Sequence, residues 1–165
     1  MSALAAGTRA PDFSALRNDG KTFSLKNELA SGPVVLAFFK VSCPVCQYAF
    51  PFFERLFQNY SNRGVTLVGV SENDAKDTHA FCQKFGVTFP VLLEDTKSFP
   101  VSNAYGLTNV PTLLWIGQDG KIEISSVGWN RKDLEAVGRK MAERQNEKPA
   151  VLIRPGEQVA DFKAG

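Results

Sequence analysis

The chain has 165 residues, enough for one domain that buries roughly two-thirds of its unfolded surface. Hydrophobic residues make up 44% of it and charged residues 22%, which is the composition of an ordinary globular protein. Because 19 Lys and Arg are interspersed with 17 Asp and Glu, the net charge of +2 argues against a nucleic-acid-binding surface.

The first part of the chain alternates between predicted strands and helices. A hairpin is predicted around the turn residues Asn18-Asp19-Gly20, with a strand at 22–25. Residues 34–39 form an apolar run bounded by Gly32-Pro33. A run without polar interruption is typical of a central strand that is buried on both faces.

A long helix is predicted to follow, because apolar residues recur on one helical face over four turns. This apolar face comprises Val45, Tyr48, Ala49, Phe52, Phe53, Leu56, Phe57 and Tyr60. Ser42 is the expected N-cap, and Pro44 lies near the first helical position, where proline is tolerated. Pro51 falls inside the helix and is expected to kink it.

The rest of the chain continues the alternation of strands and helices, which predicts an α/β fold. The elements expected there are a strand at 65–70, a helix at 75–85, a strand at 89–93, a helical turn at 101–105, a hairpin of 112–116 with 121–126, and a helix at 131–145.

The last predicted helix has Leu134, Val137 and Met141 on its inner face and Asn130 as its expected cap. Residues 1–146 are therefore predicted to form a single domain. Residues 147–165 show no periodicity and are predicted to be a C-terminal arm, packed on the domain or on a partner subunit.

The most specific signal is the pair Cys43-Pro44-Val45-Cys46 at the start of the long helix. A Cys-x-x-Cys pair in a strand–helix arrangement is typical of thiol–disulfide redox sites. The thiolate is the reactive form of cysteine, and the free amides and dipole at a helix N-terminus favour that anion. Cys43 is therefore predicted to attack, and the less exposed Cys46 to resolve the mixed disulfide.

Other cysteine chemistry is not expected. Three cysteines cannot all pair, and zinc would need more ligands than the one histidine, His79, can supply beside them, so no metal or other cofactor is predicted. Cys82 shares a helical face with Phe85 and is expected to pack in the core. The alternatives for Cys82 are resolution of a peroxide-reactive Cys43, intermolecular pairing, or activation by His79.

Taken in order, these motifs resemble the thioredoxin superfamily, and their spacing resembles the TlpA-like disulfide reductases among the AhpC/TSA redoxins. The resemblance covers about residues 7–145. It rests on Ala10-Pro11-Asp12-Phe13, on residues 38–46 followed by Pro51, on the helix and strand between Glu72 and Leu93, on Asn109-Val110-Pro111-Thr112 and on Val127-Gly128-Trp129.

The resemblance implies a thioredoxin-like fold: a central mixed β-sheet flanked by helices, with an N-terminal hairpin and an inserted helix and strand. It also implies a cis peptide bond before Pro111, which would set the backbone of Val110 beside the dithiol to pair with an extended substrate. Gly128 and Trp129 would complete the peptide-binding groove. Protein or small-molecule thiols and disulfides are the implied substrates, with a thiol reductant for recycling.

The sequence departs from these relatives at four positions. Ala37 and Ala49 stand where thioredoxins have an Asp and TlpA-like proteins a Glu, so neither carboxylate is present to accept the proton of Cys46. Ser42 replaces the usual aromatic residue, and Lys40 stands where small residues are common.

Two hypotheses follow from these departures. The charge of Lys40 stabilises the Cys43 thiolate, or the side chain points into solvent beside the groove. Resolution by Cys46 is expected to be slow near neutral pH and faster in base. Glu94 and Asp95, at the end of the inserted strand, are distant candidates for the proton acceptor.

Two other functions stay open. A thiol peroxidase of the peroxiredoxin type carries a proline seven positions, and a Thr or Ser three positions, before its reactive cysteine. No cysteine here has this pattern, and for Cys43 the two positions hold Leu36 and Lys40. A redox-sensing module would use the groove around Pro111 and Trp129 to bind a protein and would show little turnover.

No stretch of the sequence reaches the ~18 to 20 apolar residues of a membrane helix. The first ten residues lack the basic start and apolar stretch of a secretory signal. The sequence therefore predicts a cytoplasmic protein, or a periplasmic one if a leader has been removed. It makes no prediction of the oligomeric state.

Overall fold

The computed structural model describes residues 3–60 and 64–165. In chain order the elements are β1 (Ser14–Arg17), β2 (Thr22–Ser24), α1 (Leu25–Ser31), β3 (Val34–Phe39), α2 (Pro44–Tyr60), β4 (Thr66–Ser71), α3 (Ala75–Phe85), β5 (Val91–Leu93), α4 (Pro100–Ala104), β6 (Thr112–Ile116), β7 (Ile122–Val127), β8 (Trp129–Asn130), α5 (Arg131–Arg144) and β9 (Phe162–Lys163).

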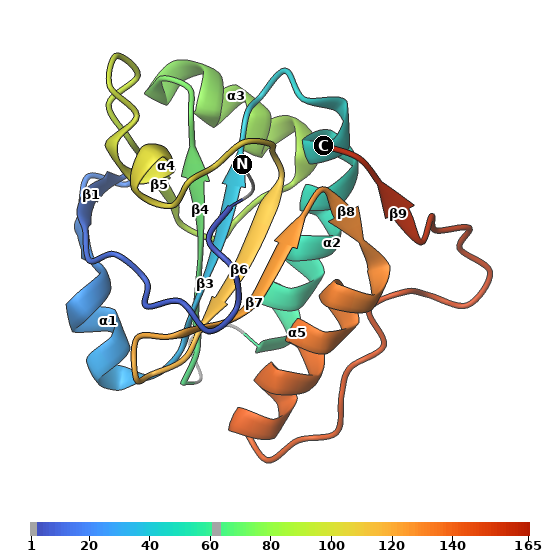
Figure 1. The fold of residues 1–165 in the computed structure, drawn as a ribbon. Helices are drawn as coiled ribbons and strands as arrows, with labels where there is room; N and C mark the ends of the chain where they lie inside the picture. The colour runs from blue at the N-terminus through green and yellow to red at the C-terminus, as the bar shows by residue number, and fades with distance from the viewer. Residues whose placement is uncertain (1–2, 61–63) are drawn as a thin grey trace.

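A mixed sheet of seven strands forms the centre of the molecule, in the order β2-β1-β5-β4-β3-β6-β7 (Figure 1). Strand β3 pairs in parallel with β4 and antiparallel with β6, and all six of its side chains are buried, as predicted for a central strand. Phe39 at the end of β3 is in register with Ser71 at the end of β4. The two chain segments that leave these strands, toward α2 and α3, therefore start side by side at the carboxyl ends of the two strands.

Helices cover both faces of the sheet (Figure 1). Alternate residues of β3 face opposite sides, because successive side chains of a strand do so. Val35, Ala37 and Phe39 join a core with residues of α2, α3 and α5. The other core places the remaining β3 side chains against residues of α1 and α4, such as Leu25 and Val101. This is the thioredoxin-like arrangement that the resemblance implied.

The sequence predicts most of these elements within two residues, including the bounds of α3 and β6. It does not predict α1 and assigns Leu25, the first residue of that helix, to a strand. The helix begins there because the Ser24 side chain accepts a hydrogen bond from the Asn27 N–H, which is an N-cap. Pro51 lies inside α2 as predicted, and the kink stays a prediction.

Residues 147–165, the C-terminal arm, run back over α5 and α2 and end beside β8. Leu152 is buried and fits over Gly138 of α5, where an added Cβ would lie 2.9 Å from the leucine Cδ1. The Arg55 side chain donates to the carbonyl oxygen of Leu152 and forms an ion pair with Glu157 at 2.7 Å. Within the described ranges, no helix is both long enough and apolar enough to span a membrane.

Candidate active site

Cys43 lies at the point where the turn after β3 becomes helix α2. The Cys43 N–H donates to the carbonyl oxygen of Lys40 at 3.1 Å, and the Cys43 carbonyl accepts from the N–H of Gln47 at 3.0 Å, as an N-cap carbonyl does. The Cys43 Sγ accepts a hydrogen bond from the N–H of Cys46 at 3.3 Å. The prediction of Ser42 as the N-cap is wrong, because Cys43 occupies that position and caps the helix with its sulfur. Pro44 is the first helical residue, as predicted.

The sulfur of Cys43 also contacts the loop before β6. Its Sγ lies 3.4 Å from the carbonyl oxygen of Val110, to which a thiol can donate. The Val110–Pro111 peptide bond is cis, as the resemblance implied, and Pro111 is buried while Val110 is half-buried. Cys43 is itself partly exposed, so its sulfur is held between a helix amide and a carbonyl and still faces solvent.

Cys46 has the opposite environment. It is fully buried in the core beneath α2. Burial raises the pKa of the Cys46 thiol well above its usual value, and the Lys40 backbone N–H acts in the opposite direction without offsetting it. Cys46 is therefore a thiol near neutral pH, and no disulfide joins it to Cys43 in this structure.

A carboxylate that the sequence did not single out, Glu72, completes the site. It lines one hollow together with Lys40 and Cys43. Its negative charge adds to the causes that raise the pKa of the Cys46 thiol. Its position follows from the register of the sheet, because Glu72 comes directly after β4 and its N–H donates to the carbonyl oxygen of Phe39 at 3.1 Å. The signal in the sequence is a carboxylate at the end of a parallel strand, where neighbouring strand ends meet.

Glu72 is half-buried, and its pKa is raised, chiefly by that burial and then by the nearby charge of Glu94. The charge of Lys40 opposes this shift. Lys40 is exposed, yet it lines the same hollow as Cys43. Its effect on the Cys43 thiolate stays a prediction.

The two distant candidates for a proton acceptor have other roles. Glu94 is buried and accepts hydrogen bonds from the N–H groups of Val101 and Ser102, both at 2.9 Å, so it holds the start of α4. The hydroxyl of Ser102 bonds both Glu94 and, at 3.3 Å, Glu72. Asp95 is exposed and accepts from the N–H of Lys97. Neither residue lines the hollow beside Cys43.

Trp129 and Gly128 are both buried, whereas residues that line an open substrate groove would be exposed. The Trp129 side chain is 1% exposed, packs on the Phe52 ring at 4.8 Å and donates from Nε1 to the carbonyl oxygen of Ala160. The Trp129 ring is therefore not available for contact with a substrate. Gly128 has a φ of +79°, and an added Cβ would lie 2.5 Å from the Lys163 carbonyl oxygen, so the end of the arm rests on it.

Cys82 packs in the core, as predicted. It is 8% exposed, and burial, followed by the charge of Glu54, raises its pKa to about 11. Its thiolate is thus disfavoured near neutral pH. His79, one turn earlier on α3, is exposed.

Sequence comparisons place the chain among thiol redox proteins. Residues 6–125 match the AhpC/TSA family. The thiol–disulfide oxidoreductase ResA of Geobacillus thermodenitrificans is 30% identical over 79% of this chain and 74% of its own length. ResA of Bacillus subtilis is 28% identical over 93% of this chain and 79% of its own length.

Structural comparisons agree with this result. A thiol:disulfide interchange protein of the thioredoxin family from Chlorobium tepidum is similar, with a TM-score of 0.68 and 26% identity over 84% of this chain and 99% of that one. A candidate protein disulfide isomerase from Bacteroides thetaiotaomicron has a TM-score of 0.79 and 25% identity over 89% of this chain and 96% of that one. The fold is therefore that of thioredoxin-like proteins.

Proposed function

The chain belongs to the AhpC/TSA family and to its ResA-like thiol–disulfide oxidoreductases, and from that premise we propose that it exchanges disulfides through Cys43 as attacking thiolate and Cys46 as resolving thiol. The observation that carries this assignment is the hydrogen bond from the Cys46 N–H to the Cys43 Sγ. It gives one sulfur a helix amide, which stabilises an anion, while the other sulfur is buried and protonated.

The exchange runs in two steps. The Cys43 thiolate attacks one sulfur of a substrate disulfide, forms a mixed disulfide and releases the other substrate sulfur as a thiolate, which takes up a proton. Cys46 then loses its proton and attacks the Sγ of Cys43. The second substrate thiolate leaves, the substrate is reduced by two electrons, and the Cys43–Cys46 disulfide holds the oxidation until an external thiol reductant removes it.

Glu72 is proposed to accept the proton that Cys46 loses in the second step. Its negative charge makes the smallest contribution to the raised pKa of the Cys46 thiol, so Glu72 lies within electrostatic reach of that thiol. The raised pKa of Glu72 itself makes it a better base than an exposed carboxylate. This role fills the gap left by Ala37 and Ala49. Glu72 comes from the neighbouring strand rather than from β3 or α2.

The same geometry supports a main-chain mode of substrate binding. The Val110 carbonyl oxygen lies 3.4 Å from the Cys43 Sγ, and β8 pairs through its main chain with the extended segment β9. In β-strand addition, main-chain hydrogen bonds of this kind give the affinity. Pro111 and Gly128 are proposed to shape this groove rather than to contact the substrate with polar atoms.

We extend the proposal to the domain that carries the activity, to its substrates and to the compartment. Residues 1–146 form the catalytic domain, which carries every group named in the two steps. Proteins or small molecules with thiols and disulfides are its substrates. The exchange takes place in the cytoplasm, or in the periplasm where a leader precedes the chain.

The test is turnover of insulin with dithiothreitol as reductant. The unaltered chain is expected to turn over, Cys43→Ser to be inactive, and Cys82→Ser, the matched loss of a core thiol, to keep its activity. Stopped-flow oxidation by hydrogen peroxide should be slow, in contrast to a peroxidase. Retained turnover in Cys43→Ser would remove the assignment, and absence of turnover in the unaltered chain would favour a redox-sensing module.

A further inference from the structure

The last five residues of the arm, 161–165, lie against the reactive end of the site; they are called the tip below. Gly165 packs on the carbonyl oxygen of Val110, where an added Cβ would lie 2.3 Å from that oxygen. The Asn109 side chain donates to the main-chain oxygen of Gly165 at 3.0 Å. The same Val110 oxygen lies 3.4 Å from the Cys43 Sγ, and Gly165 lines the hollow with Cys43. One carbonyl group thus separates the tip from the reactive sulfur.

The tip is bound as an extended chain. Strand β9 pairs antiparallel with β8, with Lys163 opposite Trp129 and Phe162 opposite Asn130. The N–H of Arg131 donates to the carbonyl oxygen of Asp161 at 2.9 Å. Strands β8 and β9 form a sheet of their own, apart from the seven-stranded sheet, and Figure 1 shows β9 beside β8 and the end of the chain near α2. The tip therefore fills an edge that another extended chain would use.

Side chains add one directed contact to this pairing. The Lys163 ammonium lies 4.9 Å from the centroid of the Tyr48 ring, which is a cation–π geometry. Phe162 is 58% exposed. The groove thus recognises main chain, with a cationic side chain over Tyr48. An extended, unfolded polypeptide has these features.

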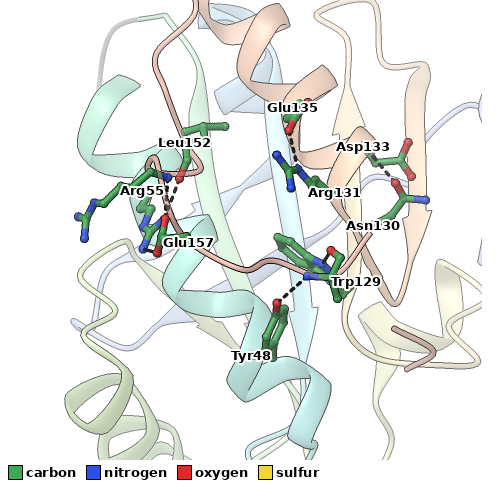
Figure 2. Close-up of polar contacts among 11 residues, drawn as sticks. Tyr48, Arg55, Trp129, Asn130, Arg131, Asp133, Glu135, Leu152 and Glu157 are labelled. Carbon is green, nitrogen blue, oxygen red and sulfur yellow. Dashed lines mark hydrogen bonds and ion pairs between the residues drawn. The ribbon is translucent and has the colours of Figure 1, made fainter. Parts of the chain in front are cut away.

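The tip is more exposed than the rest of the arm. Up to residue 160 the arm is anchored, since the Tyr48 hydroxyl accepts from the Ala160 N–H and Trp129 donates to the Ala160 carbonyl. The Arg55 side chain also forms an ion pair with Glu157 (Figure 2). All five tip residues are exposed, and a two-residue strand pair is marginal by itself. Its anchored base keeps the tip at a high effective concentration beside the groove. Such a segment closes readily and can be displaced without unfolding the domain.

We propose that residues 161–165 occupy the polypeptide groove as an internal competitor, and that an extended segment of a substrate protein displaces them by pairing with β8 in the same antiparallel register. The proposal rests on the disulfide exchange proposed above and names its substrate class: unfolded protein segments. The tip raises the KM for protein substrates, because they must displace it before they bind. A small disulfide needs no strand pairing and reaches Cys43 with the tip in place.

Two variants release the tip. Deletion of residues 161–165 removes it. Gly165→Val keeps it but sets a side chain against the Val110 oxygen, and every anchor up to residue 160 stays intact, so this variant is safe for folding. Val151→Ala changes an arm residue that is 74% exposed and does not line the hollow beside Cys43, and it is the matched control.

Iodoacetamide is the control reagent, because its small size should give it the same rate of reaction with Cys43 in every form. The first readout is the rate at which an extended peptide that carries a maleimide alkylates Cys43, followed by mass spectrometry, which needs no turnover. Both tip variants should be alkylated by this peptide faster than the unaltered chain and Val151→Ala. The second readout is insulin reduction, where KM should fall in both variants while kcat with a small aromatic disulfide is unchanged. The peptide Asp-Phe-Lys-Ala-Gly should inhibit insulin reduction by the truncated chain.

Equal rates of alkylation by the maleimide peptide and equal KM values in Gly165→Val and the unaltered chain would overturn the proposal. So would a truncated chain whose insulin reduction the peptide Asp-Phe-Lys-Ala-Gly does not inhibit. Failure of the exchange itself looks different. In that case no form of the protein, including the unaltered one, reduces insulin, while alkylation of Cys43 still reports whether the tip covers it.

Discussion

Cys43 and Cys46 have the same side chain, and their surroundings separate their roles. The Cys43 sulfur receives an amide hydrogen bond at a helix start, while Cys46 is buried and its pKa is raised. The first environment favours an anion and the second a neutral thiol. An ordered sequence of attack and resolution follows from this difference, and no third catalytic group is needed for the first step.

The second step does need a base, and Glu72→Gln tests which group it is. In the unaltered chain, the rate of Cys46 attack should rise as pH increases through the raised pKa of Glu72 and then level off, because only the ionised carboxylate accepts a proton. In Glu72→Gln the step should be slow near neutral pH and rise only in base. Rapid-quench kinetics of mixed-disulfide decay measures both profiles.

Glu94→Gln is the matched control for this prediction, since it removes the neighbouring carboxylate that holds α4. Its profile should shift toward lower pH, because a negative charge that raises the pKa of Glu72 is gone. An unchanged profile in Glu72→Gln would mean that water or another group takes the proton.

Single residues show where prediction from sequence stops. The cysteine pair, the position of Pro44 and the core role of Cys82 depend on local spacing and periodicity, and the sequence predicts them. Glu72 depends on which strands are neighbours and in which register, which no local pattern contains. The prediction of Ser42 as the N-cap was wrong because it used the general preference for serine at N-caps. In this structure a cysteine sulfur accepts the corresponding hydrogen bond instead.

Among the elements, α5 was predicted with its cap, and the cap has a measurable energy. The Asn130 side chain accepts a hydrogen bond from the Asp133 N–H at 3.0 Å. Asn130→Ala should lower the free energy of unfolding by about 1 kcal/mol, because a helix amide loses its partner. Asn130→Ser keeps an acceptor at the same place and should restore most of that loss. Urea denaturation of both variants and of the unaltered chain measures these differences, and an Asn130→Ala variant as stable as the unaltered chain would show that the cap contributes nothing.

Long elements were predicted better than short ones. Helices α2, α3 and α5 span several turns, so their apolar faces repeat often enough to be recognised. Helix α1 has seven residues and offers less than two full repeats. Strands β8 and β9 have two residues each and exist only because segments more than 30 residues apart in the chain meet.

At the scale of the whole molecule, the α/β order of elements and the family resemblance predicted the fold, but the path of the arm was left open. That path is set by anchors such as the Arg55–Glu157 ion pair, whose partners lie far apart in the sequence. Sequence periodicity does not predict such contacts, because each of them joins a single residue of the arm to a single residue of α2. The consequence for function is that the arm reaches the site.

The main anchor of the arm should be sensitive to acid. The hydrogen bond from Arg55, together with the Arg154 N–H, lowers the pKa of Glu157 from its usual 4.5 to about 2. Because the pKa is lower in the folded protein, this anchor is at full strength above pH 4.5 and is lost as the pH falls toward 2. Hydrogen exchange of peptides spanning residues 147–160 should therefore show loosening across this range.

Glu157→Gln should remove the pH dependence and leave the arm looser even at neutral pH. Protection of the arm that is unaffected by acid in the unaltered chain would show that Leu152 and the Ala160 contacts hold it without the ion pair.

The most direct test of the account is to stop the reaction between its two steps. Cys46→Ser keeps the attacking sulfur and removes the resolving one, so a mixed disulfide with an unfolded disulfide-containing protein should accumulate. Mass spectrometry of the trapped complex should find one bond, at Cys43, and the double variant Cys43→Ser, Cys46→Ser should form no complex. A trapped bond at Cys82, or unimpaired turnover by Cys46→Ser, would contradict the assignment of the two cysteines.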